Sequence, residues 1–253
     1  MPELPEVEEY GCYITRHALG RTIARADVRD ERILGEVRKE SFSRRLRGRK
    51  FIGVRRHGKH LFVSTDGQAG APVLHLHFGM TGDLAFYREV AEEPRFTRVV
   101  FDFDDGSHLA FEDMRLFGVV DLIDDPDAFI AGHRLGRDPL DPKFRPSDFV
   151  ELLANRRGAI KALLMSQEVV AGLGNLYVDE TLYETGINPS RSAIKLSDAD
   201  VRAIFTTMRK IVKKPARRLP RDIGERCPKC GGTIKRAVVG GRTTYFCGGH
   251  QKR

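Results

Sequence analysis

The sequence predicts a multidomain α+β protein, and three observations support this fold class. Short apolar segments separated by turn residues run to about residue 123 and indicate a β-sandwich. Beyond residue 143, apolar residues recur with the 3.6-residue period of helices. Near the C-terminus, two paired metal-ligand motifs flank a stretch typical of a β-hairpin. We therefore expect an N-terminal domain over residues 1–123, an Asp/Pro-rich linker over 124–143, a helical domain over 144–221 and a zinc-ribbon hairpin over 222–253.

The N-terminal domain begins with a predicted amphipathic helix over residues 5–19, which ends before Gly20. We expect this one helix to pack against the strands. The clearest β-hairpin pairs residues 99–103 with 109–111 across Asp105-Gly106, and its aromatic residues alternate to one face. The expected strands cover residues 22–28, 51–55, 61–64, 73–77, 99–104, 108–112 and 118–123.

The helical domain contains predicted helices over residues 147–155, 160–167 and 197–214. Between the last two, Gly172-Leu173-Gly174-Asn175 permits a tight turn into a further helix. The free backbone N–H groups at a helix start bind anions, so this turn is a candidate phosphate site. An ordinary helix–turn–helix hairpin explains the same pattern, and the residues alone leave both interpretations open.

Four metal-ligand residues lie close to the C-terminus. Cys227-Pro228-Lys229-Cys230 is separated by sixteen residues from Cys247-Gly248-Gly249-His250. Two such knuckles around a hairpin predict a zinc ribbon in which Cys227, Cys230, Cys247 and His250 hold one structural Zn²⁺. Disulfides are disfavoured in a cytosolic protein, and three clustered thiols cannot all pair with one another.

The charge distribution points to a polyanionic partner. Residues 209–253 contain 14 Lys/Arg and two acidic residues, a net charge of +12, whereas the whole chain carries +8. The first 208 residues therefore carry about −4. A basic C-terminal segment on a mildly acidic protein is typical of nucleic-acid binding, although a solvated charge run has the same composition. No apolar run approaches a membrane span and no signal peptide is visible, so we expect a cytoplasmic protein without a membrane partner.

The N-terminus, Met1-Pro2-Glu3-Leu4-Pro5-Glu6, contains a candidate catalytic pair. Removal of Met1 would leave Pro2 as a terminal secondary amine, with a sizeable neutral fraction near pH 7. Such an amine attacks electrophilic carbon and forms an iminium, and Glu3 beside it is a candidate general acid/base. The alternative is structural: Pro5 begins a helix and the acidic residues complement its dipole.

Three loops of the first domain contain side chains suited to contact with DNA. Arg55-Arg56-His57-Gly58-Lys59 is a basic loop between two predicted strands, and is either a phosphate site or an ordinary surface turn. Met80 lies between two glycines, after two histidines that we interpret as structural. Arg115 and Phe117 stand two apart on a third loop, where one can pair with an orphaned base and the other can wedge between base pairs.

The opening PELPEVE, the RRHGK stretch, the DMRLFG loop, the VVAGLGNLYVDE segment and the C-terminal knuckles together resemble the formamidopyrimidine-DNA glycosylase / endonuclease VIII (Fpg/Nei) family. The resemblance covers both ends of the chain and most of what lies between. It implies a helix–two-turn–helix domain and a monomeric base-excision-repair enzyme acting on damaged double-stranded DNA. It also implies that this enzyme removes an oxidised or ring-opened base and cleaves the abasic site by β,δ-elimination.

The resemblance also implies roles for individual residues. Pro2 and Glu3 match the catalytic pair, and Lys59 and Arg242 match family phosphate-binding residues that also belong to the catalytic machinery. The remaining DNA contacts implied are Met80, Arg115, Phe117, Asn175 and Lys161 as its helper. Two positions depart from the family pattern: Leu116 replaces a basic residue, and His250 replaces a fourth cysteine.

One segment of the family is missing from this chain. Formamidopyrimidine-type members have a loop between the last helix and the zinc ribbon that covers the extruded oxidised purine. Here residues 212–221 run almost directly into Cys227, which casts doubt on a preference for 8-oxoguanine. A competing interpretation is a non-catalytic zinc-ribbon DNA-binding protein, which would have no need of a free terminal proline.

Overall fold

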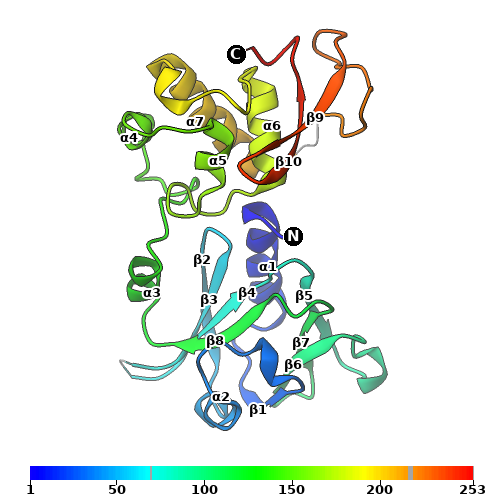
Figure 1. Ribbon diagram of the computed structural model, residues 1–253. Helices are drawn as coiled ribbons and strands as arrows, with labels where there is room; N and C mark the ends of the chain where they lie inside the picture. The colour runs from blue at the N-terminus through cyan, green and yellow to red at the C-terminus, as the bar shows by residue number, and fades with distance from the viewer. Residues whose placement is uncertain (69, 216–218, 253) are drawn as a thin grey trace. The chain divides into compact units, whose positions relative to one another are not determined.

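The computed structural model describes residues 1–68, 70–215 and 219–252. The chain forms two compact units, Met1–His133 and Arg134–Arg253. Figure 1 shows the strands of the first unit and the helices and terminal hairpin of the second. Among the helices so described, none is long and apolar enough to cross a membrane.

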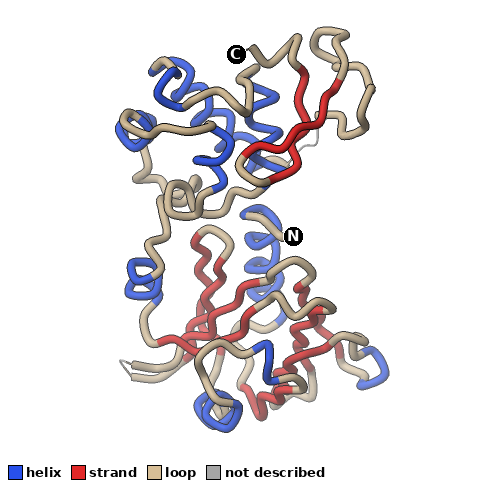
Figure 2. The backbone as a smooth tube through the Cα atoms, in the orientation of Figure 1, coloured by secondary structure: helices blue, strands red, loops and turns tan. Residues whose placement is uncertain are grey.

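The first unit is built from two four-stranded antiparallel sheets, drawn as red segments in Figure 2. One sheet has the order β1 (Ile23–Val28), β6 (Thr97–Phe103), β7 (His108–Asp113) and β5 (Gly82–Tyr87). The other has the order β2 (Phe51–His57), β3 (His60–Thr65), β4 (Val73–His77) and β8 (Val119–Ile123). The unit also contains α1 (Leu4–His17), α2 (Lys39–Leu46), α3 (Pro126–Gly132) and the 3₁₀ turns η1 (Glu31–Ile33) and η2 (Val90–Glu92).

Alternating apolar residues place the core between the two sheets. Phe101 of β6 lies directly opposite Leu109 of β7, which confirms the predicted hairpin. The Phe101 ring meets the ring of Phe51, from the other sheet, edge to face at 5.7 Å. Because both rings are fully buried, this contact joins the sheets directly.

Three elements of the first unit differ from the sequence-based expectation. Helix α2 was not predicted because it buries only Phe42 and Leu46, too few to show a helical period. Strand β5 was not predicted because Gly82 and Asp83 obscure its alternation. Helix α3 lies inside the stretch interpreted as a linker, where the Asp125 carboxylate accepts a hydrogen bond from the backbone N–H of Asp127 and caps it.

The second unit contains α4 (Pro146–Leu153), α5 (Ile160–Met165), α6 (Asn175–Thr185), α7 (Asp198–Lys213) and the turn η3 (Ala193–Lys195). Helix α7 has the predicted buried face and is capped by Ser197, whose hydroxyl accepts from the N–H of Asp200. Strands β9 (Ile234–Val239) and β10 (Arg242–Cys247) form an antiparallel hairpin. Gly240 and Gly241 turn it with positive φ angles of 58° and 72°, a conformation that favours glycine.

We predict that Phe101→Ala lowers the unfolding free energy of the first unit by about 3–5 kcal/mol, because it leaves a cavity between the sheets. Ile52→Ala is the matched control, since Ile52 is exposed on β2. Denaturant titration of both variants measures the difference. Equal losses would show that the Phe51–Phe101 contact does not join the sheets as described.

Candidate active site

The N-terminal residues are fixed by a buried helix. Pro2 is half-buried and directly precedes Glu3, the buried N-cap residue of α1. The backbone N–H of Glu3 donates to the Glu6 carboxylate at 2.9 Å, and this bond ties the start of the chain to the first turn of α1. Leu4 and Val7 are fully buried. Pro2 and the Glu3 carboxyl group are therefore held side by side at the start of a rigid element.

The basic stretch before Lys59 is a strand end and a tight turn rather than the predicted loop. Arg55 and Arg56 belong to β2 and are ion-paired, Arg55 with Asp127 and Arg56 with Glu8 of α1, each at 2.5 Å. The turn follows at Gly58, where φ is +58°. Lys59 is only 8% exposed, so the hairpin positions its side chain instead of leaving it in solvent.

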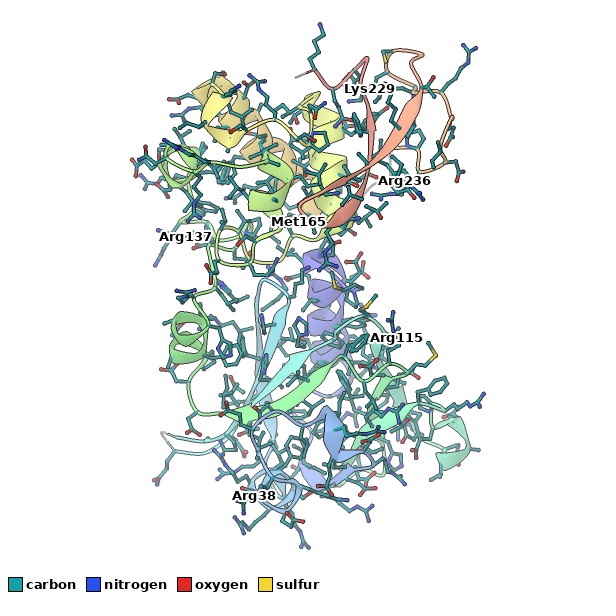
Figure 3. The ribbon with its side chains drawn as sticks, in the orientation of Figure 1. Arg38, Arg115, Arg137, Met165, Lys229 and Arg236 are labelled. Atoms are coloured by element: carbon teal, nitrogen blue, oxygen red, sulfur yellow. The ribbon has the colours of Figure 1, made fainter. Side chains whose placement is uncertain are left out.

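Two neighbouring turns of the first unit present apolar and cationic side chains to solvent. Met80 is 41% exposed and Phe117 is 54% exposed, so both large apolar side chains are open to solvent. The guanidinium of Arg115, labelled in Figure 3, lies 4.8 Å from the centre of the Phe117 ring. This cation–π contact holds the two side chains together as one projecting group.

A buried carboxylate locks these two turns to each other. The Asp113 side chain is buried and accepts hydrogen bonds from the Thr81 hydroxyl, from the N–H of Arg115 at 3.1 Å and from the N–H of Gly118 at 2.7 Å. Thr81 belongs to the Met80 turn, and the two N–H groups belong to the Phe117 turn. Gly79 reinforces the lock, because a Cβ there would lie 2.3 Å from the backbone of Phe117.

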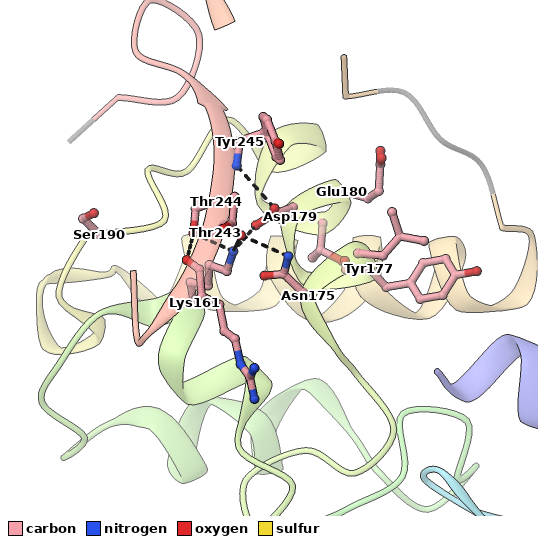
Figure 4. Close-up of polar contacts among 12 residues, drawn as sticks. Lys161, Asn175, Tyr177, Asp179, Glu180, Ser190, Thr243, Thr244 and Tyr245 are labelled. Carbon is pink, nitrogen blue, oxygen red and sulfur yellow. Dashed lines mark hydrogen bonds and ion pairs between the residues drawn. The ribbon is translucent and has the colours of Figure 1, made fainter. Parts of the chain in front are cut away.

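A buried ion pair joins the helices of the second unit to strand β10 (Figure 4). Lys161 Nζ of α5 lies 2.7 Å from Asp179 Oδ1 of α6, and both side chains are 0% exposed. The same ammonium group donates to Thr244 Oγ1 at 2.6 Å and to the Thr243 carbonyl at 3.2 Å. Asn175 Nδ2 donates to the Thr243 carbonyl at 3.0 Å. Arg242, the first residue of β10, directly precedes this anchored segment.

Further charges surround the ion pair. Burial raises the pKa of the Asp179 carboxyl, and the positive charges of Lys161 and Arg221 oppose that shift. The buried Glu180 carboxylate accepts from the N–H of Leu219 at 3.1 Å. These contacts tie the chain between α7 and β9 to helix α6.

Three thiols gather at the base of the β9–β10 hairpin. The Sγ atoms of Cys227, Cys230 and Cys247 all lie within 4.8 Å of one another. Burial alone would raise the pKa of the Cys227 thiol, but hydrogen bonds from the Tyr183 hydroxyl and from backbone N–H groups lower it to about 7. Thiolates held at this spacing suit a tetrahedral Zn²⁺.

Three family models match successive parts of this chain. They are the formamidopyrimidine-DNA glycosylase N-terminal domain over residues 1–120, the formamidopyrimidine-DNA glycosylase H2TH domain over 135–219, and the zinc finger found in FPG and IleRS over 224–248. A formamidopyrimidine-DNA glycosylase of Heliobacterium modesticaldum is 35% identical and the match covers 100% of both chains. One of Symbiobacterium thermophilum is 34% identical over 98% of this chain and 88% of its own. The chain belongs to the formamidopyrimidine-DNA glycosylase family.

Solved structures of the family agree with this assignment. The Lactococcus lactis formamidopyrimidine-DNA glycosylase bound non-covalently to DNA with an AP site has a TM-score of 0.92 and 26% identity, covering 99% of this chain and 100% of its own. A MutM complex with DNA containing carbocyclic 8-oxo-G has a TM-score of 0.91 and 27% identity, covering 100% of both chains. The predicted β-sandwich, helical domain and zinc-finger hairpin are therefore confirmed.

Two residues predicted for this glycosylase site make other contacts in the structure. Lys161 was predicted to assist a phosphate contact; its ammonium group is buried and bonded to Asp179, Thr243 and Thr244. His250 was predicted as the fourth zinc ligand but lies outside the cluster of three cysteine thiols, with Nε2 2.7 Å from the Tyr183 carbonyl oxygen. The turn after Cys247, closed by a hydrogen bond from the N–H of residue 251, directs His250 towards α6.

Sequence reasoning missed the residues that position the site. Asp113 and Asp179 were not singled out, because a lone Asp in a loop or helix normally faces solvent. Their partners Thr81 and Lys161 stand 32 and 18 residues away along the chain. The available signals were their places in the family-like stretches, with Asp113 at the start of DMRLFG and Asp179 near the end of VVAGLGNLYVDE.

We predict that Asp113→Asn weakens binding to a duplex with an uncleavable abasic-site analogue about tenfold. Asn keeps the size of Asp but replaces one acceptor oxygen with a donor, which leaves a buried N–H or hydroxyl unpaired at about 1–3 kcal/mol. Glu112→Gln, one residue earlier, is the control. Titration of labelled duplex measures both variants, and equal affinities would exclude Asp113 as the lock between the two turns.

We also predict that wild-type protein contains one zinc ion per chain and that Cys230→Ser loses most of it. Zinc binding supplies folding free energy of about 10 kcal/mol or more in finger peptides, so metal loss unfolds the hairpin. Cys12→Ser is the control, because Cys12 is an exposed thiol outside the group. Metal analysis of purified protein gives the zinc content, and unchanged zinc in Cys230→Ser would contradict the thiol assignment.

Proposed function

We propose that this base-excision-repair DNA glycosylase and AP lyase works through the amine of Pro2. The damaged nucleotide leaves the base stack, because its sugar cannot be reached inside the duplex. After removal of Met1, the Pro2 nitrogen lone pair forms a bond to C1′ as the C1′–base bond breaks, and the base departs with that electron pair and a proton. The family's known glycosylase and AP lyase chemistry supports this assignment.

Glu3 then serves the proton transfers of the reaction. As a general acid it protonates the sugar ring oxygen, so that the ring opens and the nitrogen–C1′ bond becomes an iminium. The iminium acidifies the adjacent C2′ proton, whose removal expels the 3′ phosphate, and a second elimination expels the 5′ phosphate. Water finally hydrolyses the imine and frees Pro2. The observation that carries this proposal is the half-buried Pro2 beside the buried Glu3 at the fixed start of α1.

The remaining residues bind and distort the duplex. We propose that Lys59, Asn175 and Arg242 contact backbone phosphates, while Met80, Arg115 and Phe117 enter the gap left by the extruded base. The exposure of Met80 and Phe117 supports this wedge, since neither side chain has an apolar neighbour to cover it fully. Leu116 contributes no charge here. Leu116 has a φ of +55° and packs against the core of the first unit, which anchors the loop that carries Arg115 and Phe117.

Lys161 takes a new role in this proposal, as a positioning residue. Its ammonium group fixes Thr243 and Thr244, and Asn175 fixes the same Thr243 carbonyl, so β10 cannot slide relative to α5 and α6. Arg242 at the start of β10 is thereby held in place. We propose that Cys227, Cys230 and Cys247 hold a structural zinc ion that keeps the base of the same hairpin closed and supplies no chemistry to the reaction.

Lesion preference follows from the short connection after α7. Residues 214–226 join α7 to Cys227, and residues 216–218 of this connection lie outside the described residues. Leu219 is bonded to Glu180, so this part of the connection is tied to α6 rather than extended. We propose that the lesion-capping loop is absent and that oxidised purines are held weakly. We infer that the protein acts as a monomer on damaged double-stranded DNA in the bacterial cytoplasm.

We predict that borohydride traps the wild-type protein on duplex DNA containing an abasic site, because the iminium is reducible. Pro2→Gly should lower the trapped fraction strongly, since a primary amine on a flexible residue replaces the fixed secondary amine. Glu3→Gln should slow base excision more than cleavage of a preformed abasic site. A non-catalytic DNA-binding protein would give no trapping, and full trapping by Pro2→Gly would place the nucleophile elsewhere.

We further predict that 8-oxoguanine is excised slowly relative to abasic-site cleavage, whereas formamidopyrimidine and oxidised pyrimidines are excised faster than 8-oxoguanine. A pocket without a polar cap discriminates poorly, while the phosphate contacts are independent of the base. Single-turnover rates on matched duplexes measure the comparison. Excision of 8-oxoguanine as fast as abasic-site cleavage would contradict this prediction, because it would show that the pocket binds oxidised purines tightly without the loop.

A further inference from the structure

A second basic surface lies on the first unit, outside the residues assigned above. Residues 38–50 contain seven Lys/Arg and one Glu, whereas the first 208 residues of the chain, taken together, carry net negative charge. This segment comprises α2 and the connection to β2. Figure 3 labels Arg38 at the start of α2. We call this segment, together with the facing strand β1, the α2 surface.

A pocket opens between α2 and β1. It has a volume of about 410 Å³ and is lined by Ala24, Arg25, Ala26, Ser43, Arg44 and Arg47. The Ser43 hydroxyl donates to the Ala26 carbonyl at 2.6 Å, which fixes α2 against the edge strand β1. Arg44 lies in the last turn of α2 and Arg47 is its C-cap residue, and both residues line this pocket.

Among the described residues, two of the three arginines that line the pocket have no acidic partner. Arg25 is paired with Asp27 at 2.9 Å, and Arg45 with Asp124 at 2.7 Å. Arg44 and Arg47 are exposed, and within residues 1–68, 70–215 and 219–252 their guanidinium groups have neither an ion pair nor a hydrogen bond. Two free guanidinium groups at the rim of one pocket match the oxygen geometry of a phosphate, which they can bind in a bidentate manner.

The α2 surface is remote from the active site within the first unit. In Figure 1 the N-terminus and α2 lie at opposite ends of this unit. The positive charge also extends beyond the pocket, with Arg38 and Lys39 before it and Arg49 and Lys50 after it. A single small phosphate would use only the pocket, whereas a line of charges suits a polymer with regularly spaced phosphates.

We propose that the α2 surface is a second DNA-binding site, which holds the phosphate backbone of an undamaged duplex segment while the active site is occupied by another. Arg44 and Arg47 grip one phosphate in the pocket, and the flanking cations contact its neighbours. Because such contacts read no bases, the site binds any sequence and weakens as salt rises. A protein holding two segments can pass between them without first releasing DNA.

The test uses the full-length protein saturated with one duplex that contains an uncleavable abasic-site analogue. A second, undamaged duplex with a different fluorophore is then titrated in at low salt. We expect the wild type to bind it, and Arg44→Gln/Arg47→Gln to bind it at least about tenfold more weakly. The slope of log affinity against log salt concentration should fall by about 1, because one phosphate contact is lost. Abasic-site cleavage should be unchanged.

Arg88→Gln/Arg95→Gln is the matched control, because it removes two exposed arginines from the connection between β5 and β6. It should bind the second duplex as the wild type does. The proposal is overturned if the wild type binds no second duplex, or if both double variants lose it equally. Binding of inorganic phosphate by a protein that binds no second duplex would also overturn it, in favour of a small-phosphate site. Cleavage of a natural abasic-site duplex, measured separately with the same protein preparations, distinguishes these outcomes from a failure of Pro2 catalysis.

Discussion

The structure depends on immobilising Pro2 and Glu3 at the start of α1. Chain termini are ordinarily the least ordered part of a protein, yet the amine that we propose as the nucleophile must be held in place to attack one carbon atom. Here α1 achieves this, because its buried residues Leu4, Val7 and Ile14 belong to the core between the sheets or next to it. Arg56 adds a second tie through Glu8 of the same helix. The β-sandwich thus supports the residue that we propose as the nucleophile.

In the second unit, Arg242 must also be held in place, because it lies at the tip of a two-stranded hairpin. A two-stranded hairpin alone is marginally stable, so it needs attachments at both ends. The cluster of three cysteine thiols closes the base of the hairpin. The Lys161–Asp179 pair, together with Asn175, fixes the strand that begins with Arg242. Burying two charges costs desolvation free energy and adds little net stability, but a partly broken pair is strongly unfavourable. Such a pair therefore specifies one position of the hairpin.

Much of the fold was predictable from sequence, because its signals are periodic and local. The alternation around Phe101, the apolar face of α7 and the cysteine spacing each identified an element. Helix α2 was not predicted, because only Phe42 and Leu46 mark its buried face. The candidate site residues came from chemistry and family resemblance, but the residues that position them did not. Asp113 and Lys161 look like surface charges until partners distant in the chain enclose them.

The central claim is that the Pro2 nitrogen forms the covalent bond to the sugar, and mapping that bond tests it most directly. Protein reduced with borohydride on abasic-site DNA would be digested with nuclease and protease, and the cross-linked peptide sequenced by mass spectrometry. The account predicts that the peptide lacks Met1 and carries the deoxyribose remnant on its terminal Pro2. An adduct on Lys59 or any other lysine, with Pro2 unmodified, would contradict it.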